Sequence, residues 1–352
     1  MKVKSLELNN FKRFGYGRLD FTDPETGLAR DLVVLLGPNG CGKSTVLQAI
    51  ACTLGTATER LDFPNQLAWP GLDLELAATA WPTPYRVVTE VEFTTDEIAA
   101  TNEYYGLADR QSLSVPDKPS AVQLVLAANT LRPQDHGAIP LFLGRRFAGQ
   151  VLKLLEEGHD AYRRVGTVFW YTDRRDITSL TPTRDHKRNE ITFDEALLRR
   201  RLSDLAQFHD RIERGSYSLR PGQRDLFADL QRAYEAVFPG RRLDGPVPRS
   251  DIDEVLQEPW FYLFDGKNQY EIQEMSGGEK AVFPILFDFA NWRINRSVVL
   301  IDELELHLHP PMQQAFLRAL ESLGEGNQFI ITTHSDSIEA IVPEESIIRM
   351  GN

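Results

Sequence analysis

The feature that most constrains this chain is a glycine-rich loop between an apolar run, Leu32 to Leu36, and a helix-like stretch, Val46 to Leu54. The loop has the spacing GxxxxGK[ST], in which glycines let backbone N–H groups curl around phosphate oxygens without interference from a Cβ atom. An ordinary glycine-rich turn rarely has the complete spacing with both flanks. The predicted phosphate-binding residues are Gly37, Pro38, Asn39, Gly40, Cys41, Gly42, Lys43, Ser44 and Thr45.

Two of these residues carry chemistry in their side chains. Lys43 is expected to reach the β- and γ-phosphates of a nucleotide, and the Ser44 hydroxyl is expected to ligate magnesium. The helix N-terminus that opens at Ser44 adds partial positive charge. The sequence therefore predicts a site for ATP with Mg²⁺.

Composition narrows the class of protein. No apolar run approaches the roughly 18 residues that cross a bilayer, and no signal-peptide core follows Met1, which predicts a cytoplasmic protein without membrane contact. The formal net charge of -12 argues against binding nucleic acid through bulk charge. Residues 161–250 depart from this balance, with 18 Lys and Arg against 13 Asp and Glu. A local basic surface for DNA therefore stays open, although a solvated helical face is the commoner outcome of such a run.

The predicted elements form an N-terminal β part, an irregular excursion and a helical insertion. Lys2 to Leu8 alternates like an edge strand, and residues 240–250 are typical of a linker. The excursion covers residues 61–85. Further strands are predicted over residues 17–21, 32–36, 86–93, 121–127 and 167–171, and helices over residues 193–212 and 226–237.

A second glycine-rich motif follows a predicted hairpin over residues 260–272. Ser276, Gly277, Gly278 and Glu279 precede a helix-like stretch, Ala281 to Trp292. Backbone donors at such a helix start suit a phosphate. An ordinary helix N-cap is an equally good interpretation of the motif taken by itself.

The apolar run from Val298 to Ile301 predicts a buried strand that ends in two carboxylates, Asp302 and Glu303. In P-loop enzymes an acid at this place holds the magnesium shell, which is the role expected of Asp302. Glu303 is the natural base for the attacking water.

Another predicted strand, Gln328 to Thr332, leads to His334, at the edge of a parallel sheet where ligands bind. We expect His334 to contact the γ-phosphate. The alternating residues Glu303, Glu305, His307 and His309 could instead form a metal cluster. We disfavour the cluster, because two prolines after His309 are typical of the entry to a helix over residues 312–320.

Four motifs in this order, GPNGCGKST, MSGGEK, VVLIDELELHLHP and ITTHS, resemble those of ABC-type ATPase heads. The closest resemblance is to the branch with RecF, the structural-maintenance-of-chromosomes (SMC) heads and the overcoming-lysogenisation-defect (OLD) family, whose opening strand resembles LELNNFKRF. It implies an α/β P-loop fold with a mixed sheet core, an N-terminal antiparallel β subdomain and a helical insertion. Residues 1–60 and 260–352 would form the two halves of the head, and residues 61–259 an inserted lobe.

The resemblance also implies a head-to-tail homodimer with two ATP molecules between the heads. The P-loop of one chain would face Ser276, Gly277 and Gly278 of the other, and Glu305 to His307 would meet the partner head. Three departures stand out: only Gln66 and Gln123 are weak candidates for the usual nucleotide-linking glutamine, no long coiled coil interrupts the middle, and no room remains after His334 for an OLD-type nuclease domain.

The expected function is an ATPase whose dimerisation operates a separate effector, for which a nuclease in antiphage defence is one candidate. A DNA-repair ATPase that clamps DNA directly is the alternative enzyme. ATP could also act mainly as dimer glue, with negligible turnover. A transporter motor ranks last, because its compact form lacks a middle of this length.

Overall fold

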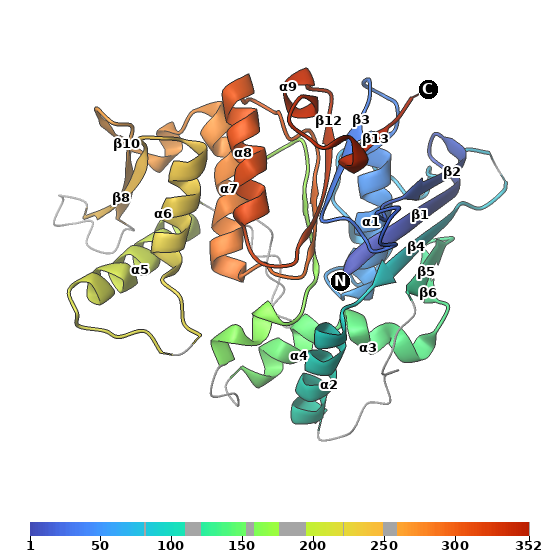
Figure 1. Cartoon of the computed structure of the whole chain (residues 1–352), viewed down its shortest axis with the longest axis horizontal. Helices are drawn as coiled ribbons and strands as arrows, with labels where there is room; N and C mark the ends of the chain where they lie inside the picture. Colours follow the sequence, from blue (N-terminus) through green and yellow to red (C-terminus); the bar gives the residue numbers. More distant parts are fainter. Residues whose placement is uncertain are drawn as a thin grey trace. The chain divides into compact units, whose positions relative to one another are not determined.

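The computed structural model describes residues 1–80, 82–109, 121–152, 158–175, 195–220, 222–248 and 259–351. The chain divides into two compact units, which are described separately (Figure 1). The first unit comprises Met1–Asp173, Ile294–Leu304 and Gly324–Asn352, and the second comprises Arg174–Arg293 and Glu305–Leu323. No helix in the described ranges is long and apolar enough to cross a membrane.

An antiparallel sheet of five strands in the first unit has the order β2-β1-β4-β5-β6. The strands are β1 (Lys2–Phe11), β2 (Phe14–Asp20), β4 (Arg86–Glu92), β5 (Val122–Ala127) and β6 (Thr130–Pro133). The predicted edge position of the first strand is wrong, because β1 pairs with β2 on one side and β4 on the other. Its alternation has another cause: Lys2 and Lys4 form ion pairs with Asp31 and Glu92, while the alternate apolar residues are buried.

A parallel sheet of five strands in the same unit has the order β13-β3-β12-β11-β7. Its strands are β3 (Leu32–Leu36), β7 (Val168–Tyr171), β11 (Val298–Ile301), β12 (Gln328–Thr333) and β13 (Ile347–Arg349). Every residue of β11 and β12 is buried. Continuous burial is expected of parallel strands that are covered on both faces, and it explains why these strands are apolar runs without alternation.

The helix after the P-loop, α1 (Lys43–Ala57), contacts strands of both sheets in this unit (Figure 1). Burial all round its circumference follows from this position, and 13 of its 15 residues are buried. A smaller apolar cluster joins two other helices through Ala100, Tyr104 and Phe147. The remaining helices of the unit are α2 (Thr95–Asp109), α3 (Ile139–Phe142), α4 (Gly144–Val151) and α9 (Asp336–Glu339).

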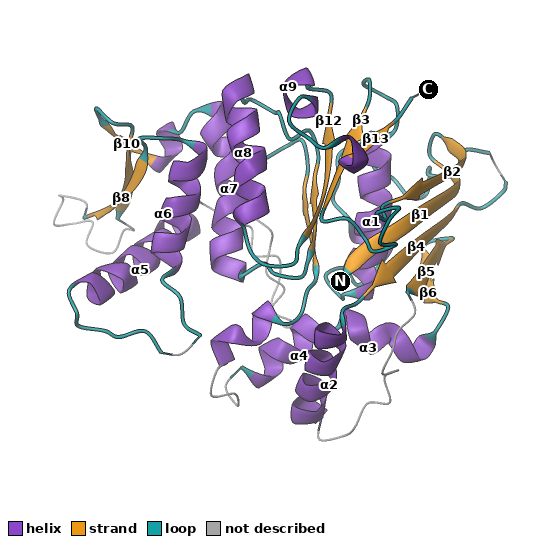
Figure 2. Ribbon diagram, in the orientation of Figure 1, coloured by secondary structure: helices purple, strands orange, loops and turns teal. Residues whose placement is uncertain are grey.

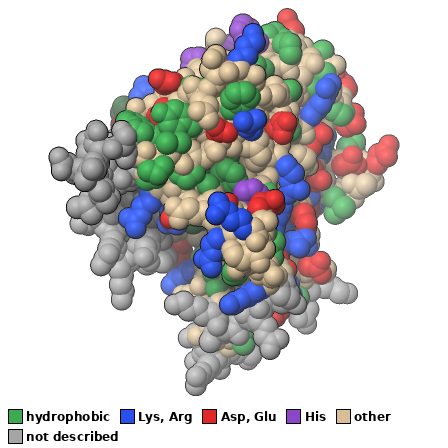
Figure 3. Space-filling view, turned by 90° about the vertical axis from the view of Figure 1, so that its left-hand side faces the viewer, with side chains coloured by type: hydrophobic (Ala, Val, Ile, Leu, Met, Phe, Trp, Pro, Cys, Tyr) green, Lys and Arg blue, Asp and Glu red, His purple; other side chains and the backbone are tan. Residues whose placement is uncertain are grey.

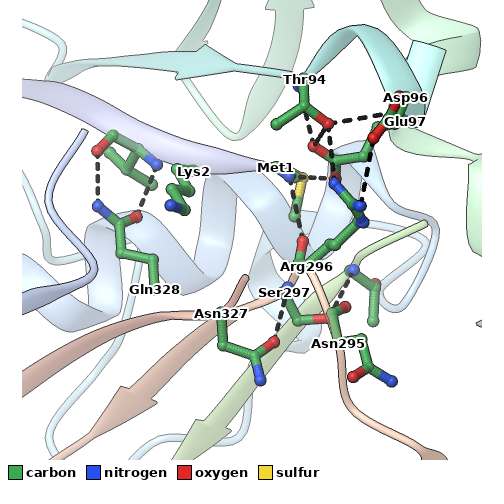
Figure 4. A network of polar contacts seen from close by, with 12 residues as sticks. Met1, Lys2, Thr94, Asp96, Glu97, Asn295, Arg296, Ser297, Asn327 and Gln328 are labelled. Atoms are coloured by element: carbon green, nitrogen blue, oxygen red, sulfur yellow. Dashed lines mark hydrogen bonds and ion pairs between the residues drawn. The ribbon is translucent and has the colours of Figure 1, made fainter. Parts of the chain in front are cut away.

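One side chain links the two sheets. Gln328, the first residue of β12, accepts from the backbone N–H of Val3 at 2.7 Å and donates to the carbonyl oxygens of Val3 and Arg30 at 2.9 and 3.0 Å. Figure 4 shows Gln328 within the polar network around the N-terminus. Close by, Asn327 accepts from the N–H of Ser297 at 2.9 Å. Since Gln328 is fully buried, its amide must be satisfied inside the protein, and these three bonds do so.

The second unit combines a small sheet with helices (Figure 2). The sheet has the order β10-β9-β8, with β8 (Arg242–Val247), β9 (Trp260–Phe264) and β10 (Gln269–Glu271). The predicted linker over residues 240–250 is wrong, because β8 lies there. Its Gly245 has φ of 111° at a bulge and its Pro246 lies on an edge strand, where proline is tolerated, so the sequence concealed the strand.

The described part of this unit contains the helices α5 (Glu195–Glu213), α6 (Leu226–Val237), α7 (Gly277–Trp292) and α8 (Pro310–Ser322). Helix α6 packs against the other three. Its buried residues Phe227, Leu230, Tyr234 and Val237 recur at helical spacing, which confirms the core-facing stripe expected from the sequence.

Candidate functional site

The loop after β3 has the backbone shape of a phosphate cradle. Gly40 and Gly42 have φ values of 77° and 105°, in the left-handed region that only glycine enters without strain. A Cβ atom on Gly42 would also lie 2.7 Å from the Phe14 ring, and one on Gly37 would lie 2.4 Å from the carbonyl oxygen of Met350. Packing therefore disfavours a side chain at positions 37 and 42, independently of whether a ligand is bound.

Lys43 and Cys41 are both buried in this loop. The Nζ atom of Lys43 donates to the carbonyl oxygens of Gly37 and Pro38 at 2.7 and 3.1 Å, so the ammonium lies within the curl of the loop. Cys41 is only 8% exposed. Its backbone, rather than its thiol, is the part that can meet a phosphate.

The carboxylate of Asp302 is the centre of a hydrogen-bond network. Its Oδ1 atom accepts from the hydroxyl of Ser44 at 2.9 Å and from the hydroxyl of Thr332 at 2.6 Å. Asp302 is 3% exposed, and burial raises its pKa, although hydrogen bonds from Thr332 and Ser44 oppose the increase. The two residues predicted to hold magnesium, Ser44 and Asp302, thus lie in direct contact.

Glu303 follows Asp302 in a strained backbone conformation. Its φ is 47°, a left-handed value that costs a residue with a Cβ atom about 1–2 kcal/mol. Its backbone N–H donates to the Thr332 hydroxyl oxygen at 2.8 Å. Such strain is typical of functional sites. It persists only where the contacts of the surrounding structure compensate for its cost in free energy.

The strand order brings the predicted residues to one edge of the parallel sheet. β3, β12 and β11 are parallel neighbours, and the P-loop, His334 and the Asp302–Glu303 pair follow their carboxyl ends. His334 is exposed there, one residue beyond the buried Thr333. Ligands of open parallel sheets bind at this edge.

Sequence reasoning missed three residues at this edge. Thr332 lies within a recognised motif, but only the folded strand shows that its hydroxyl joins Asp302 to Glu303. Asp173 follows the end of β7, and its charge raises the pKa of Asp302. Trp69 comes from the irregular excursion, and its side chain acts to lower the pKa of Asp302. The run Tyr171-Thr172-Asp173 at a strand end was the available signal for Asp173.

The two weak candidates for the nucleotide-linking glutamine lie elsewhere in the first unit. Gln66 accepts from the backbone N–H groups of Asp62 and Phe63 at 2.8 and 3.4 Å, which closes a turn of 3₁₀ helix (Pro64–Gln66). Gln123 lies in β5 of the antiparallel sheet. Neither glutamine forms a hydrogen bond with Asp302 within the described ranges. The residue that follows the end of β7, the strand next to β11, and acts on the pKa of Asp302 is Asp173.

These residues fit a nucleotide with a divalent cation. The loop offers a lysine ammonium and two glycines, Gly40 and Gly42, in the left-handed conformation that strains a residue with a Cβ atom. Beside it, the buried carboxylate of Asp302 and the Ser44 hydroxyl present the hard oxygen ligands that Mg²⁺ prefers. The described ranges contain no group of three or more His, Cys, Asp or Glu side chains arranged for a metal, so a cluster of that kind is absent from them.

The second glycine motif lies in the other unit and begins α7. Ser276 is the N-cap and Glu279 completes a capping box, which satisfies backbone N–H groups of the first turn. Ser276 and Gly277 are exposed. A Cβ atom on Gly278 would lie 3.0 Å from the carbonyl oxygen of His307, so the motif packs closely on the loop before α8.

The residues of the segment from Glu305 to His309, which the sequence offered as a contact with the partner head or as a metal cluster, differ in their exposure to solvent. Glu305 is buried, whereas His307 and His309 are exposed. His307 has φ of 58°, and His309 is the N-cap residue of α8. The helix entry expected at the two prolines is confirmed, since α8 starts at Pro310.

The basic stretch over residues 161–250 is only partly described. In the described part, arginines pair with acids: Arg214 with Asp210, Arg224 and Arg232 with Asp229, and Arg242 with Asp244. Figure 3 shows basic and acidic side chains interspersed on the face that it draws. This pairing matches a solvated surface better than a phosphate-binding stripe.

Four features together define an ABC-type P-loop ATPase head. They are the P-loop, the buried strand followed by Asp302 and Glu303, His334 beyond the next strand, and the capped helix start at Ser276. The chain belongs to the family described as "AAA domain, putative AbiEii toxin, Type IV TA system", whose model matches residues 156–338. Residues 1–105 match a second model, described as "AAA ATPase domain".

Several curated proteins are similar to the chain along its whole length. The "Retron Vc95 probable ATPase" of Vibrio cholerae serotype O1 biovar El Tor is 22% identical over 99% of this chain and 73% of its own length. The "Retron Ec83 probable ATPase" of Escherichia coli is 22% identical over 100% and 72%. The "Septu protein PtuA" of Bacillus mycoides (strain KBAB4) is 24% identical over 99% of this chain but only 40% of its own length.

Solved structures confirm the fold. An SMC head bound to the C-winged helix domain of ScpA has a TM-score of 0.54 and 16% identity over 100% of this chain and 95% of that one. An SMC head with an extended coiled coil, bound to the C-terminal domain of ScpA derived from Pyrococcus furiosus, has a TM-score of 0.51 and 15% identity over 99% and 93%. Taken together with the two family matches and the curated relatives, this fold confirms the predicted class, an ABC-type head of the SMC, RecF and OLD branch.

Proposed function

We propose that this chain binds and hydrolyses ATP, closes with a second copy as a head-to-tail homodimer around two ATP molecules, and thereby regulates a separate effector protein in antiphage defence. The observation that carries the proposal is the hydrogen-bond chain from Ser44 through Asp302 and Thr332 to Glu303. It joins the predicted metal ligands to the predicted base within one unit.

The residues of this site have separate proposed roles in phosphoryl transfer. When bound, Mg²⁺ would neutralise charge that develops on the phosphate oxygens. Ser44 and Asp302 would hold that ion, and Lys43 would turn from the loop carbonyls to the β- and γ-phosphates. Glu303, fixed by the hydroxyl of Thr332, would orient the attacking water and accept its proton. His334 would contact the γ-phosphate.

The homodimer is proposed because the phosphate-binding elements come as two separate sets. The first unit carries the P-loop, the Asp302–Glu303 pair and His334, while the second carries the exposed Ser276 and Gly277 at the start of α7. In the class of ABC-type heads, the second set of one copy meets the nucleotide held by the first set of the other. Gly278 and Glu279 would support this contact from within the helix.

The relatives suggest what the dimer does. Proteins named for retron and Septu systems match the chain along its full length, and both retron relatives are named as probable ATPases. We therefore place the chain in a defence system in which ATP-driven closure controls a partner protein. A nuclease is our specific candidate for the effector.

Glu303→Gln provides the test. The amide holds water but accepts no proton, so turnover should fall by about 10²–10⁴ while ATP binding survives. The ATP-bound dimer should then accumulate, which size measurement with ATP and Mg²⁺ would show, with Lys43→Ala as the monomeric control. Near-parental turnover would remove Glu303 from the role of base, and a variant that stays monomeric would overturn the ATP sandwich. A parent dimer as persistent as that of Glu303→Gln would favour ATP as dimer glue.

A further inference from the structure

Ser276, the serine of the second glycine-rich motif, does not have its hydroxyl hydrogen free for a phosphate. Ser276 donates it to the Oε2 atom of Glu279 at 2.8 Å, and the backbone N–H of Ser276 donates to the same oxygen at 2.9 Å. A hydroxyl has a single hydrogen to donate. Before Ser276 can donate to a γ-phosphate, this hydrogen must rotate away from Glu279.

The other oxygen of the Glu279 carboxylate has three donors of its own. Arg241 approaches Oε1 at 2.6 Å, and the hydroxyls of Tyr234 and Tyr270 also donate to it. They come from three segments of the second unit: α6, the turn after α6, and β10. Burial alone would raise the pKa of Glu279, but the bonds from Arg241, Tyr234 and Tyr270 outweigh it and lower the pKa to about 2. The carboxylate is therefore a fixed negative charge beside Ser276, with 1% of Glu279 exposed.

This charge matters when a nucleotide approaches. A triphosphate that accepts a hydrogen bond from Ser276 brings its own negative charge close to Glu279, and it removes one of the donors that Glu279 uses. The negative charges of the triphosphate and of the Glu279 carboxylate would repel each other strongly where water is excluded from between them. Arg241 is the positive group that contacts Glu279, so its charge decides whether the repulsion is cancelled.

We propose that Arg241 is a positioning residue for the motif Ser276-Gly277-Gly278: by neutralising Glu279, it lets the Ser276 hydroxyl rotate, so that it donates its hydrogen bond to the γ-phosphate held by the P-loop of a second copy and no longer to Glu279. This inference rests on the proposed ATP sandwich. It gives the Glu279 of the motif an indirect role, since the Oε1 atom of its carboxylate is held by Tyr234, Arg241 and Tyr270.

The test is made in the full chain with Glu303→Gln, so that hydrolysis does not remove the dimer. Arg241→Met is expected to weaken ATP-dependent dimerisation by at least about tenfold, because it leaves a buried carboxylate uncompensated. Binding of ATP to the monomer, followed by a fluorescent nucleotide analogue, should be unchanged, since the P-loop lies in the other unit. Arg242→Met is the matched control, because the neighbouring Arg242 pairs with Asp244.

A second substitution separates charge from folding. Adding Glu279→Gln to Arg241→Met removes both charges and should restore most of the lost dimerisation, and Arg241→Lys should retain part of it. If Arg241 acted only through the packing and hydrogen bonds of its side chain and not through its charge, the double variant would instead lose more dimerisation. If Arg241→Met dimerises like the Arg242→Met control, or if the double variant is no better than Arg241→Met, the inference is wrong while the sandwich stands. If the Glu303→Gln parent itself stays monomeric with ATP, the sandwich and the inference both fail.

Discussion

Thr332 donates its hydroxyl hydrogen to the carboxylate of Asp302 over 2.6 Å; Thr332 lies in β12, and Asp302 directly follows the neighbouring parallel strand β11. The same hydroxyl oxygen accepts from the backbone N–H of Glu303, which has a left-handed φ of 47°. One threonine thus holds both the predicted metal ligand and the predicted base. A defect at Thr332 should therefore affect the chemical step more than nucleotide binding.

Thr332→Val tests this relationship. The substitution keeps the shape of the side chain but removes both hydrogen bonds, of which the one to the Asp302 carboxylate, a charged group, is worth about 1.5–3 kcal/mol. We expect ATP turnover to fall by about 10- to 100-fold with little change in ATP affinity. Steady-state kinetics and equilibrium binding measure the two effects. Thr332→Ser restores the hydroxyl and should recover most of the activity; equal loss in both variants would point to packing instead.

Lys43→Ala tests the P-loop. The Nζ atom of Lys43 lies inside the loop, on the carbonyl oxygens of Gly37 and Pro38, so its removal takes away the cation that would meet the β- and γ-phosphates. We expect ATP affinity to fall by at least about 100-fold, since bonds to charged groups are involved, while the circular dichroism spectrum stays unchanged. Unchanged affinity would refute the assignment of the loop.

Asp173→Asn tests the residue that the sequence left unassigned. The Oδ1 atom of Asp173 is buried without a hydrogen-bond partner, and its charge raises the pKa of Asp302. A second carboxylate near the metal ligand should favour Mg²⁺. We expect the Mg²⁺ concentration for half-maximal turnover to rise by about tenfold or less, measured by titration at saturating ATP. Asp31→Asn, at an aspartate that is 75% exposed, is the control and should leave the titration in place.

Gly37→Ala tests the packing behind the P-loop. A Cβ atom there would lie 2.4 Å from the carbonyl oxygen of Met350, which is backbone and cannot move aside like a flexible side chain. We expect a loss of stability of about 1–3 kcal/mol, in the range of other overpacked sites. Urea denaturation would measure it. Gly15→Ala, where a Cβ atom meets nothing within 4 Å, is the control.

Acid should destabilise the second unit through Glu279. Its pKa is lowered from 4.5 to about 2, so its contribution is complete above pH 4.5 and is lost as the pH falls toward 2. Urea denaturation at several pH values should therefore show stability dropping across this window. Glu279→Gln has no such titration and should show a shallower drop there. The same steepness in both proteins would mean that other carboxylates dominate acid unfolding.

The parts of the site that the sequence could predict are those whose chemistry lies in one short segment. The P-loop, Asp302 with Glu303, and the N-cap at Ser276 each follow from residues within a few positions, and the buried strands β11 and β12 follow from unbroken apolar runs. Local spacing determines these features because one turn or one strand makes them.

The rest depends on contacts between distant segments. Thr332 meets Asp302 from 30 positions away, and Tyr234 meets Glu279 from 45 positions away. No periodicity encodes such pairs. Strand β8 was concealed for a different reason, since Gly245 and Pro246 are turn residues in most settings and are tolerated here only at a bulge and an edge.

Gln328 fixes the position of β12 along its strand axis relative to β1 of the antiparallel sheet. Its three bonds to Val3 and Arg30 lie at the start of β12, whereas Thr332 and Thr333 end the same strand, about 13–17 Å further along. An extended strand transmits a shift along its axis almost without loss. We therefore expect a displacement of the N-terminal strand by a fraction of an ångström to shift the Thr332 hydroxyl relative to Asp302, because Val3 of the antiparallel sheet is joined to Thr332 through Gln328 and β12.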